Sequence, residues 1–233
     1  NMSDGPLKDW SGWILKKAVP VGRRRRGLER AKAQLVSHDG PLFIFPLQLE
    51  TDFQIRLHGP PEGLRETLRK TIASFEDYAP ADAALIVKLH PLDNGWTPWE
   101  RLTREAAEAA GVGDRVLWFD GGDLDGMVAR CNGVVVVNST VGLSALRLGA
   151  PVVALGKAIY DLPGLTHQGT LDGFWTGGKA PDAEKLSLFL DALSSAIQVP
   201  GGFDGSGAKP GAAAMAAKMI APPPYETGTS RCE

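Results

Sequence analysis

Five short, uninterrupted apolar runs constrain the fold of this chain more than any other feature of its sequence. They span Leu42–Leu47, Ala84–Leu89, Arg115–Phe119, Gly133–Val137 and Val152–Leu155. Helical patterns follow at Pro61–Tyr78, Pro98–Ala110, Asp123–Arg130, Val141–Leu148 and Asp182–Ile197. Continuous apolar strands that alternate with helices predict a parallel sheet covered on both faces. Right-handed crossovers then give a single Rossmann-like, doubly wound α/β domain of about five strands.

The composition changes on both sides of this regular region, which we place at residues 40–199. In residues 15–32 many lysines and arginines face one acid, Glu29, and Arg23, Arg24, Arg25 and Arg26 are consecutive. Because like charges repel, we expect residues 1–39 to form a solvated, mobile basic arm. The alternative is a patch for an anionic membrane surface. Residues 200–233 are rich in Gly, Ala and Pro, which predicts a loose tail with a short helix at Ala212–Ile220.

Charge and cysteine content exclude several classes of protein. The formal net charge is −2, which argues against a nucleic-acid partner. Cys131 and Cys232 are too few for a disulfide framework or a multi-cysteine zinc site, and the histidines show no ligand spacing. We therefore expect no metal and no resident cofactor. No apolar run reaches the roughly 18 residues of a membrane span and no secretory signal is visible, so we expect a cytoplasmic protein.

Polar and titratable residues concentrate in the loops that leave the predicted strands. These loops span residues 48–54, 90–93, 120–123, 138–142 and 156–161, whereas the loops that enter the strands hold ordinary turn residues. In a doubly wound sheet, ligands bind at the carboxyl ends of the strands. The asymmetry therefore predicts a functional crevice along one edge of the sheet.

The loop after the fourth strand resembles an anion site. Asn138, Ser139 and Thr140 precede a predicted helix that has Gly142 in its first turn. Free N–H groups and the helix dipole favour an anion there, and the two hydroxyls add donors for a phosphate. The alternative is that Ser139 or Thr140 only caps the helix. The GxxxxGK[ST] pattern of a Walker A loop is absent.

The loop after the second strand adds two cationic side chains. Lys88 and His90 lie two residues apart, so they share one face of the strand, and Pro91 fixes the chain where His90 leaves the sheet. A lysine beside a histidine suits a phosphate or a carboxylate. The alternative is that His90 is a hydrogen-bonded structural histidine.

The loop after the first strand carries a candidate catalytic carboxylate. Asp52 precedes Phe53 and is flanked by Gln48 and Gln54, so it could act as a base or nucleophile. The alternative is that Asp52 only forms a turn.

A long loop follows the fifth strand. It carries Lys157, Tyr160 and Asp161 and is punctuated by Gly and Pro, as functional loops often are. Phe174 and Trp175 follow it and could either close over a ligand or seal the core.

Several long motifs in one order resemble the capsular polysaccharide synthesis and export family of the KpsS/KpsC type. They are FPLQLETDFQIR, VKLHPLDNGW, VVVVNSTVGLSALRLGAPVVALGKAIYDLPGLTHQGTLDGFW, and Gln198 with Gly201-Gly202-Phe203, and they cover about residues 40–203. The resemblance implies a retaining glycosyltransferase that moves 3-deoxy-manno-oct-2-ulosonic acid (Kdo) from CMP-Kdo to a lipid-linked acceptor such as a phosphatidylglycerol. It further implies other capsule assembly proteins as partners and a place on the inner face of the cytoplasmic membrane.

The same resemblance assigns roles to individual residues. It implies that His90 and Pro91 bind CMP, that Ser139 and Thr140 bind phosphate, and that Asp52 is the nucleophile between Gln48 and Gln54. The implied fold is the C-terminal, donor-binding half of a GT-B glycosyltransferase. At 233 residues the chain is too short for both halves, so we expect another polypeptide or a longer gene product to supply the acceptor half. The alternative function is a non-catalytic nucleotide-binding or export-assembly module.

Overall fold

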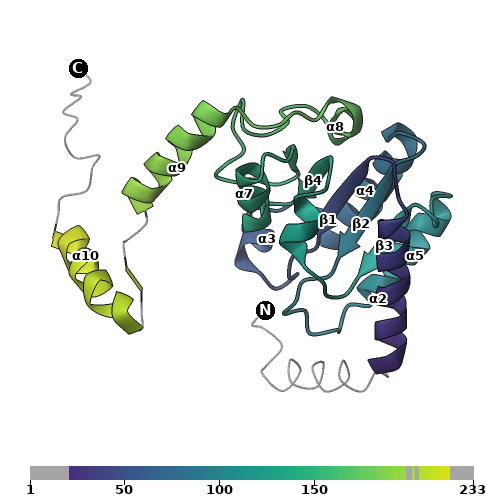
Figure 1. The fold of residues 1–233 in the computed structure, drawn as a ribbon, viewed down its shortest axis with the longest axis horizontal. Coiled ribbons are helices and arrows are strands. Elements are labelled where there is room, and N and C mark those ends of the chain that lie inside the picture. The colour runs from purple at the N-terminus through teal and green to yellow at the C-terminus, as the bar shows by residue number, and fades with distance from the viewer. Residues whose placement is uncertain (1–20, 198–200, 203–204, 221–233) are drawn as a thin grey trace. The chain divides into compact units, whose positions relative to one another are not determined.

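The computed structural model describes residues 21–197, 201–202 and 205–220. These residues form two compact units that divide after Leu186, somewhat before the expected boundary at residue 199. The first unit contains the sheet (Figure 1). Within the described ranges, no helix combines the length and apolarity that a membrane crossing requires.

The first unit is built around a five-stranded parallel sheet in the order β3-β2-β1-β4-β5. The strands are β1 (Leu42–Pro46), β2 (Ala84–Lys88), β3 (Val116–Phe119), β4 (Gly133–Val136) and β5 (Val152–Ala154). Each expected apolar run thus contains a strand, and the parallel α/β sheet is confirmed. The chain leaves β1 toward β2 on one side and later returns to place β4 on its other side, so the topological switch point lies between β1 and β4.

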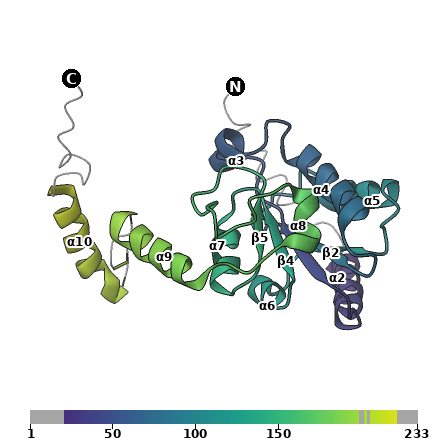
Figure 2. The same cartoon turned by 90° about the horizontal axis from the view of Figure 1, so that it is seen from above.

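Helices cover both faces of the sheet, as the continuous burial of β1, β2 and β4 requires (Figure 2). On one face, α4 (Leu64–Tyr78), α5 (Trp99–Ala109) and α8 (Leu171–Gly177) pack against strand side chains such as Phe45 and Val87. The other face carries α2 (Val21–Val36), α6 (Leu124–Val128) and α7 (Thr140–Arg147). Leu64, Leu68, Ile72 and Phe75 of α4 are buried at the spacing of one helical face.

The expectation of a mobile basic arm is wrong for residues 21–36, which form α2 and contact β3. Ala31 and Leu35, four residues apart, are both buried. Burial of this apolar stripe stabilises the helix although the preceding residues repel one another. Residues 1–20 of the expected arm lie outside the described residues.

Two short helices lie in segments for which the sequence predicted no helix. α3 (Phe53–His58) follows β1 and buries Ile55, and α8 contains Phe174 and Trp175. The indole ring of Trp175 packs edge-on against Phe43 at 5.0 Å and donates from Nε1 to Ser74 Oγ at 2.8 Å. Both Phe174 and Trp175 are buried, so they seal the core.

The second unit contains the end of α9 (Ala183–Ile197), a 3-10 turn at Gly205–Gly207 and α10 (Ala208–Ile220). α10 begins four residues before the helix expected at Ala212–Ile220. The prolines that we expected to end it, Pro222–Pro224, lie outside the described residues.

Candidate functional site

Two predicted site residues meet at the switch point of the sheet. Gln48 follows β1 and Asn138 follows β4, and two hydrogen bonds join them although they are ninety residues apart. Gln48 Nε2 donates to Asn138 Oδ1 at 2.9 Å, and the Asn138 main-chain N–H donates to Gln48 Oε1 at 3.1 Å. Gln48 is only 7% exposed. This pair therefore stitches together the carboxyl ends of β1 and β4, where a ligand of a doubly wound sheet binds.

The same asparagine also holds the first turn of α3 beside the end of β4. Asn138 Nδ2 donates to the main-chain oxygen of Gln54 at 3.0 Å. One carboxylate oxygen of Asp52 accepts from Gln54 N at 2.9 Å and so caps the first turn of α3. Asp52 is exposed. Capping accounts for one carboxylate oxygen, and Asp52 lies on the surface beside the switch point.

The start of α7 forms the opposite wall. Ser139 caps this helix by accepting from Val141 N at 3.1 Å, while Thr140 begins the helix and is exposed. The Tyr160 hydroxyl donates to the main-chain oxygen of Ser139. Gly142 makes room for this tyrosine, because a Cβ at position 142 would lie 2.6 Å from Tyr160 Cζ. Burial, with the nearby charge of Asp161, raises the pKa of Tyr160, so its hydroxyl stays protonated and remains a donor.

Lys88 and His90 lie at the end of β2 and in the loop that follows it. Lys88 ends β2 and is 6% exposed, and its side chain forms no hydrogen bond or ion pair with the described part of the chain. Burial lowers the pKa of Lys88, and the charges of Asp120 and Asp123 oppose that shift. The half-buried His90 accepts at Nδ1 from Leu92 N at 3.1 Å, so the proton of its neutral ring lies on Nε2.

Two of the remaining candidates, Lys157 and Asp161, lie in the loop after β5 and have different surroundings. The Lys157 main-chain N–H donates to the oxygen of His58 at 2.8 Å, which attaches this loop to the end of α3, and the residue itself is exposed. Asp161 Oδ1 accepts from Thr166 Oγ1 at 2.6 Å and from Gln168 Nε2 at 3.2 Å. Asp161 therefore stabilises its own loop. Pro91 is exposed in the turn that follows His90.

The basic run starts at this same edge of the sheet. The last turn of α2 leads into the amino end of β1, so α2 runs antiparallel to the strands. Leu28 lies next to the loop that leaves β3, since a Cβ on Gly121 would be 4.0 Å from Leu28 Cδ2. The turn of α2 that carries Arg23–Arg26 precedes Leu28 and therefore lies on the side of the carboxyl edge.

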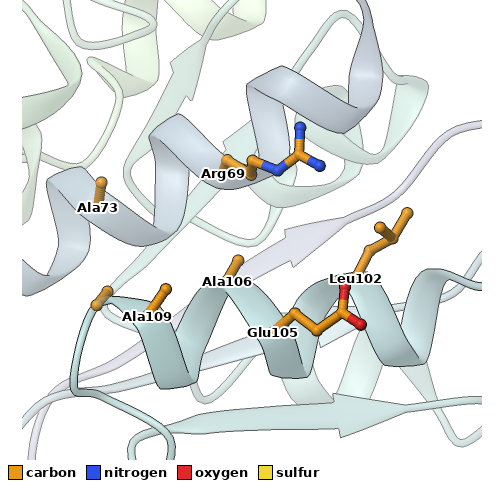
Figure 3. A pocket seen from close by; sticks show the side chains of 7 residues that line it. Arg69, Ala73, Leu102, Glu105, Ala106 and Ala109 are labelled. Carbon is orange, nitrogen blue, oxygen red and sulfur yellow. The ribbon is translucent and has the colours of Figure 1, made fainter.

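Two hollows of the surface lie away from these residues. One, of about 330 Å³, lies between α4 and α5 and is lined mainly by small apolar side chains (Figure 3). Its polar side chains are Arg69 and Glu105, neither of which follows a strand. Among the residues that the structure describes, no group of His, Cys, Asp or Glu could hold a metal ion. Neither of the two hollows is lined by a predicted site residue.

One group of residues at this edge escaped the sequence analysis. Glu50, Arg65 and Thr97 form a hydrogen-bonded cluster between the loops after β1 and β2. Each is an ordinary polar residue in a loop or at a helix start, and no spacing rule connects them. The position of Glu50 between the candidate residues Gln48 and Asp52 was the only feature of the sequence that pointed to this cluster.

Comparisons with known proteins agree with the motifs. The family model described as capsule polysaccharide biosynthesis protein matches residues 3–203. The capsule polysaccharide modification protein LipB of Neisseria meningitidis is 35% identical over 201 residues, which cover 84% of this chain and 46% of LipB. The capsule polysaccharide export protein KpsS of Escherichia coli is 32% identical over 190 residues, which cover 82% of this chain and 48% of KpsS. The chain thus spans about half the length of these relatives.

A solved structure with some likeness is the beta Kdo 2,7 transferase KpsC of Thermosulfurimonas dismutans. It is 20% identical with a TM-score of 0.43, and the match covers 72% of this chain and 62% of that one.

Proposed function

This chain belongs to the capsule polysaccharide biosynthesis family, and on that premise we propose that it is the donor-binding half of a retaining glycosyltransferase. It takes Kdo from CMP-Kdo and passes it to a lipid-linked acceptor. The observation that carries the proposal is the Gln48–Asn138 pair, because it gathers the Asp52 loop and the start of α7 around one switch point. Gln48, Asp52, His90 and Ser139, which lie within the motifs that led us to expect this family, each follow a strand at that edge of the sheet.

The residue types suit the charges of the reaction. When the bond from Kdo to CMP breaks, positive charge develops at the anomeric carbon and negative charge on the leaving phosphate. The carboxylate of Asp52 stabilises the first, and Lys88, His90 and the start of α7 stabilise the second. No separate strong acid is needed, because CMP leaves as a stable anion.

Two displacements account for retention of configuration. In the first, an Asp52 carboxylate oxygen bonds to the anomeric carbon while the bond to the CMP phosphate oxygen breaks, and CMP departs with the electron pair. In the second, the acceptor hydroxyl oxygen displaces the carboxylate and its proton passes to solvent. Ser139 N-caps α7 and holds the first turn, where Thr140 offers its hydroxyl to phosphate.

The partners follow from this role. The acceptor is a lipid such as a phosphatidylglycerol, so we place the protein in the cytoplasm at the inner face of the cytoplasmic membrane, beside other capsule assembly proteins. The basic turn of α2 with Arg23–Arg26 would attract both an anionic lipid surface and the anionic donor. Raising the salt concentration should weaken binding to anionic vesicles and leave any binding to neutral vesicles unchanged.

Substitution of Asp52 tests the mechanism directly. Asn caps a helix about as well as Asp, so Asp52→Asn keeps the start of α3 and removes only the nucleophile. We expect Kdo transfer, measured with CMP-Kdo, a lipid acceptor and the full-length protein, to fall about a thousandfold or more, while CMP affinity by calorimetry stays within a few-fold. Asp114→Ala, in an exposed loop that enters β3, is the matched control and should keep full activity. Normal transfer by Asp52→Asn would remove Asp52 from the reaction.

A second candidate function rests on the length of the match. Because the chain spans about half of LipB and of KpsS, it could bind a nucleotide or an assembly partner without turnover. CMP binding without transfer, with lipid acceptor present, would favour this module. Absence of CMP binding would reject both site-based functions, and preference for UDP over CMP would indicate a different nucleotide sugar.

A further inference from the structure

Three side chains from separate segments form one hydrogen-bonded cluster at the carboxyl edge of the sheet. Glu50 Oε1 accepts from Arg65 Nε at 3.1 Å, and Glu50 Oε2 accepts from Thr97 Oγ1 at 2.6 Å. Arg65 Nη2 also donates to Thr97 Oγ1 at 3.2 Å, which closes the triangle. We call these three residues the edge clamp. Both oxygens of one carboxylate are thus used, each by a different segment of the chain.

The edge clamp differs from the other ion pairs of the described residues. Most of those join side chains three or four residues apart on one helix, such as Arg69 with Glu66 and Arg104 with Glu100. The edge clamp instead joins the loop after β1, the first turn of α4 and the loop after β2. An isolated exposed pair contributes little to global stability, but a closed network can fix the relative position of the segments that it joins.

The loop after β2 has its own internal bonds, so a tie at Thr97 extends back toward His90. Asp93 N donates to the His90 oxygen at 3.0 Å, and Gly95 N donates to Asp93 Oδ1 at 2.8 Å. Trp99 N donates to the Thr97 oxygen at 2.8 Å, where α5 begins. Asp93 is buried, which anchors the middle of the loop.

On the other side, Glu50 lies two residues from Gln48 and two residues from Asp52. Gln48 is fixed by Asn138, and Asp52 N donates to the oxygen of Leu49 at 3.0 Å. The short segment between these anchors has little freedom once Glu50 is held. The edge clamp therefore acts on the Asp52 loop and on the His90 loop together.

We propose that Glu50, Arg65 and Thr97 are positioning residues that set the separation of Asp52 from His90. In the mechanism above, one of these groups faces the anomeric carbon and the other the leaving phosphate, so their separation must match one donor molecule. The catalytic meaning of the edge clamp rests on the proposed function. The effect of the edge clamp on the two loops does not depend on the proposed function. The loop effect and the catalytic effect can therefore be measured separately.

Hydrogen exchange of the unliganded protein tests the effect on the loops. We expect Glu50→Gln and Thr97→Val to raise exchange at the amides of Asp52, Asp93 and Gly95 about tenfold, because each removes a bond to a charged carboxylate. The melting temperature should hardly change. Thr97→Ser, which keeps the hydroxyl, should restore the protection. Glu62→Gln, which removes an ion pair to Lys70, is the control and should leave these amides unchanged.

Kinetics of the full-length protein test the positioning role. Thr97→Val should lower kcat for Kdo transfer about tenfold or more and change KM for CMP-Kdo by less, because the binding groups are intact while their separation is not. Thr97→Ser should recover kcat. If exchange at the three amides is unchanged in Glu50→Gln and Thr97→Val, the edge clamp is refuted whether or not CMP binds. If exchange rises but the protein neither binds CMP nor transfers Kdo, the proposed function fails and the edge clamp stands as a structural tie only.

Discussion

Removal of the Gln48 side chain should cost far more stability than removal of its neighbour Gln54. Gln48 is buried and forms two hydrogen bonds with Asn138, at 2.9 and 3.1 Å. At about 1 kcal/mol for each bond, plus the cost of leaving a group of the half-buried Asn138 unpaired, Gln48→Ala should lower the free energy of unfolding by ~2–3 kcal/mol. For a unit of this size that corresponds to a fall of ~5–10 °C in Tm.

Urea denaturation followed by tryptophan fluorescence measures this loss, because Trp99 and Trp175 are buried in the same unit. A double-mutant cycle with Asn138→Ala isolates the pair, and we expect a coupling energy of ~1–2 kcal/mol. Gln54→Ala is the control. Its side chain is exposed, and the bond from Asn138 goes to its main-chain oxygen, so the loss should stay below about 0.5 kcal/mol. Equal losses of stability in Gln48→Ala and Gln54→Ala, or a coupling energy near zero, would refute the stabilising role of the Gln48–Asn138 pair.

Three further substitutions test other contacts. Gly142→Ala should destabilise by ~1–3 kcal/mol in calorimetry, because the new Cβ meets the Tyr160 ring, and Tyr160→Leu in the same chain should recover part of the loss. Lys88→Met should raise the free energy of unfolding at pH 7 and abolish CMP binding. The pKa of Lys88 is lowered in the folded state, so the unfolded chain binds more protons and the stability of the wild type should rise as the pH approaches 10.5. Lys88→Met should lack this rise. Parallel pH profiles of the stability of the two proteins would contradict this reasoning. Trp175→Phe should cost ~1–2 kcal/mol through the lost bond to Ser74, and adding Ser74→Ala should cost about 1 kcal/mol more, because Ser74 Oγ also donates to Asp172 Oδ1 at 2.6 Å.

The sheet and the gathering of polar loops at one of its edges were predictable because both depend on local patterns. An apolar run such as Ala84–Leu89 needs burial on two faces, and only a strand in a covered sheet provides it for so short a segment. The polar loops then had to share one edge, because parallel strands end on the same side. Ser139 as a cap and Asp52 at a turn are likewise local, and the structure shows both.

The rest depended on contacts that no local pattern contains. Four adjacent arginines indicated an unpacked arm, but burial of Ala31 and Leu35 outweighs that repulsion, and only the tertiary structure supplies the surface against which they are buried. The α3 helix has six residues and one buried side chain, Ile55, too few to show a period. The Gln48–Asn138 pair and the edge clamp each join segments distant in the chain, so they become visible only when the fold is complete.

The order of the strands also determines when the carboxyl edge of the sheet can be completed during synthesis. β1 can pair with β2, and β2 with β3, as soon as those segments leave the ribosome, since they follow one another. The pairing of β1 with β4, at Phe43 with Gly133 and Ile44 with Val134, must wait for a much longer loop to close, which costs chain entropy. A nascent chain that stops before β4 can therefore hold three strands and half of the edge, with Gln48 still lacking its partner. We expect ligand binding to appear abruptly as the nascent chain lengthens past β4 and α7, and not in proportion to the amount of sheet already folded.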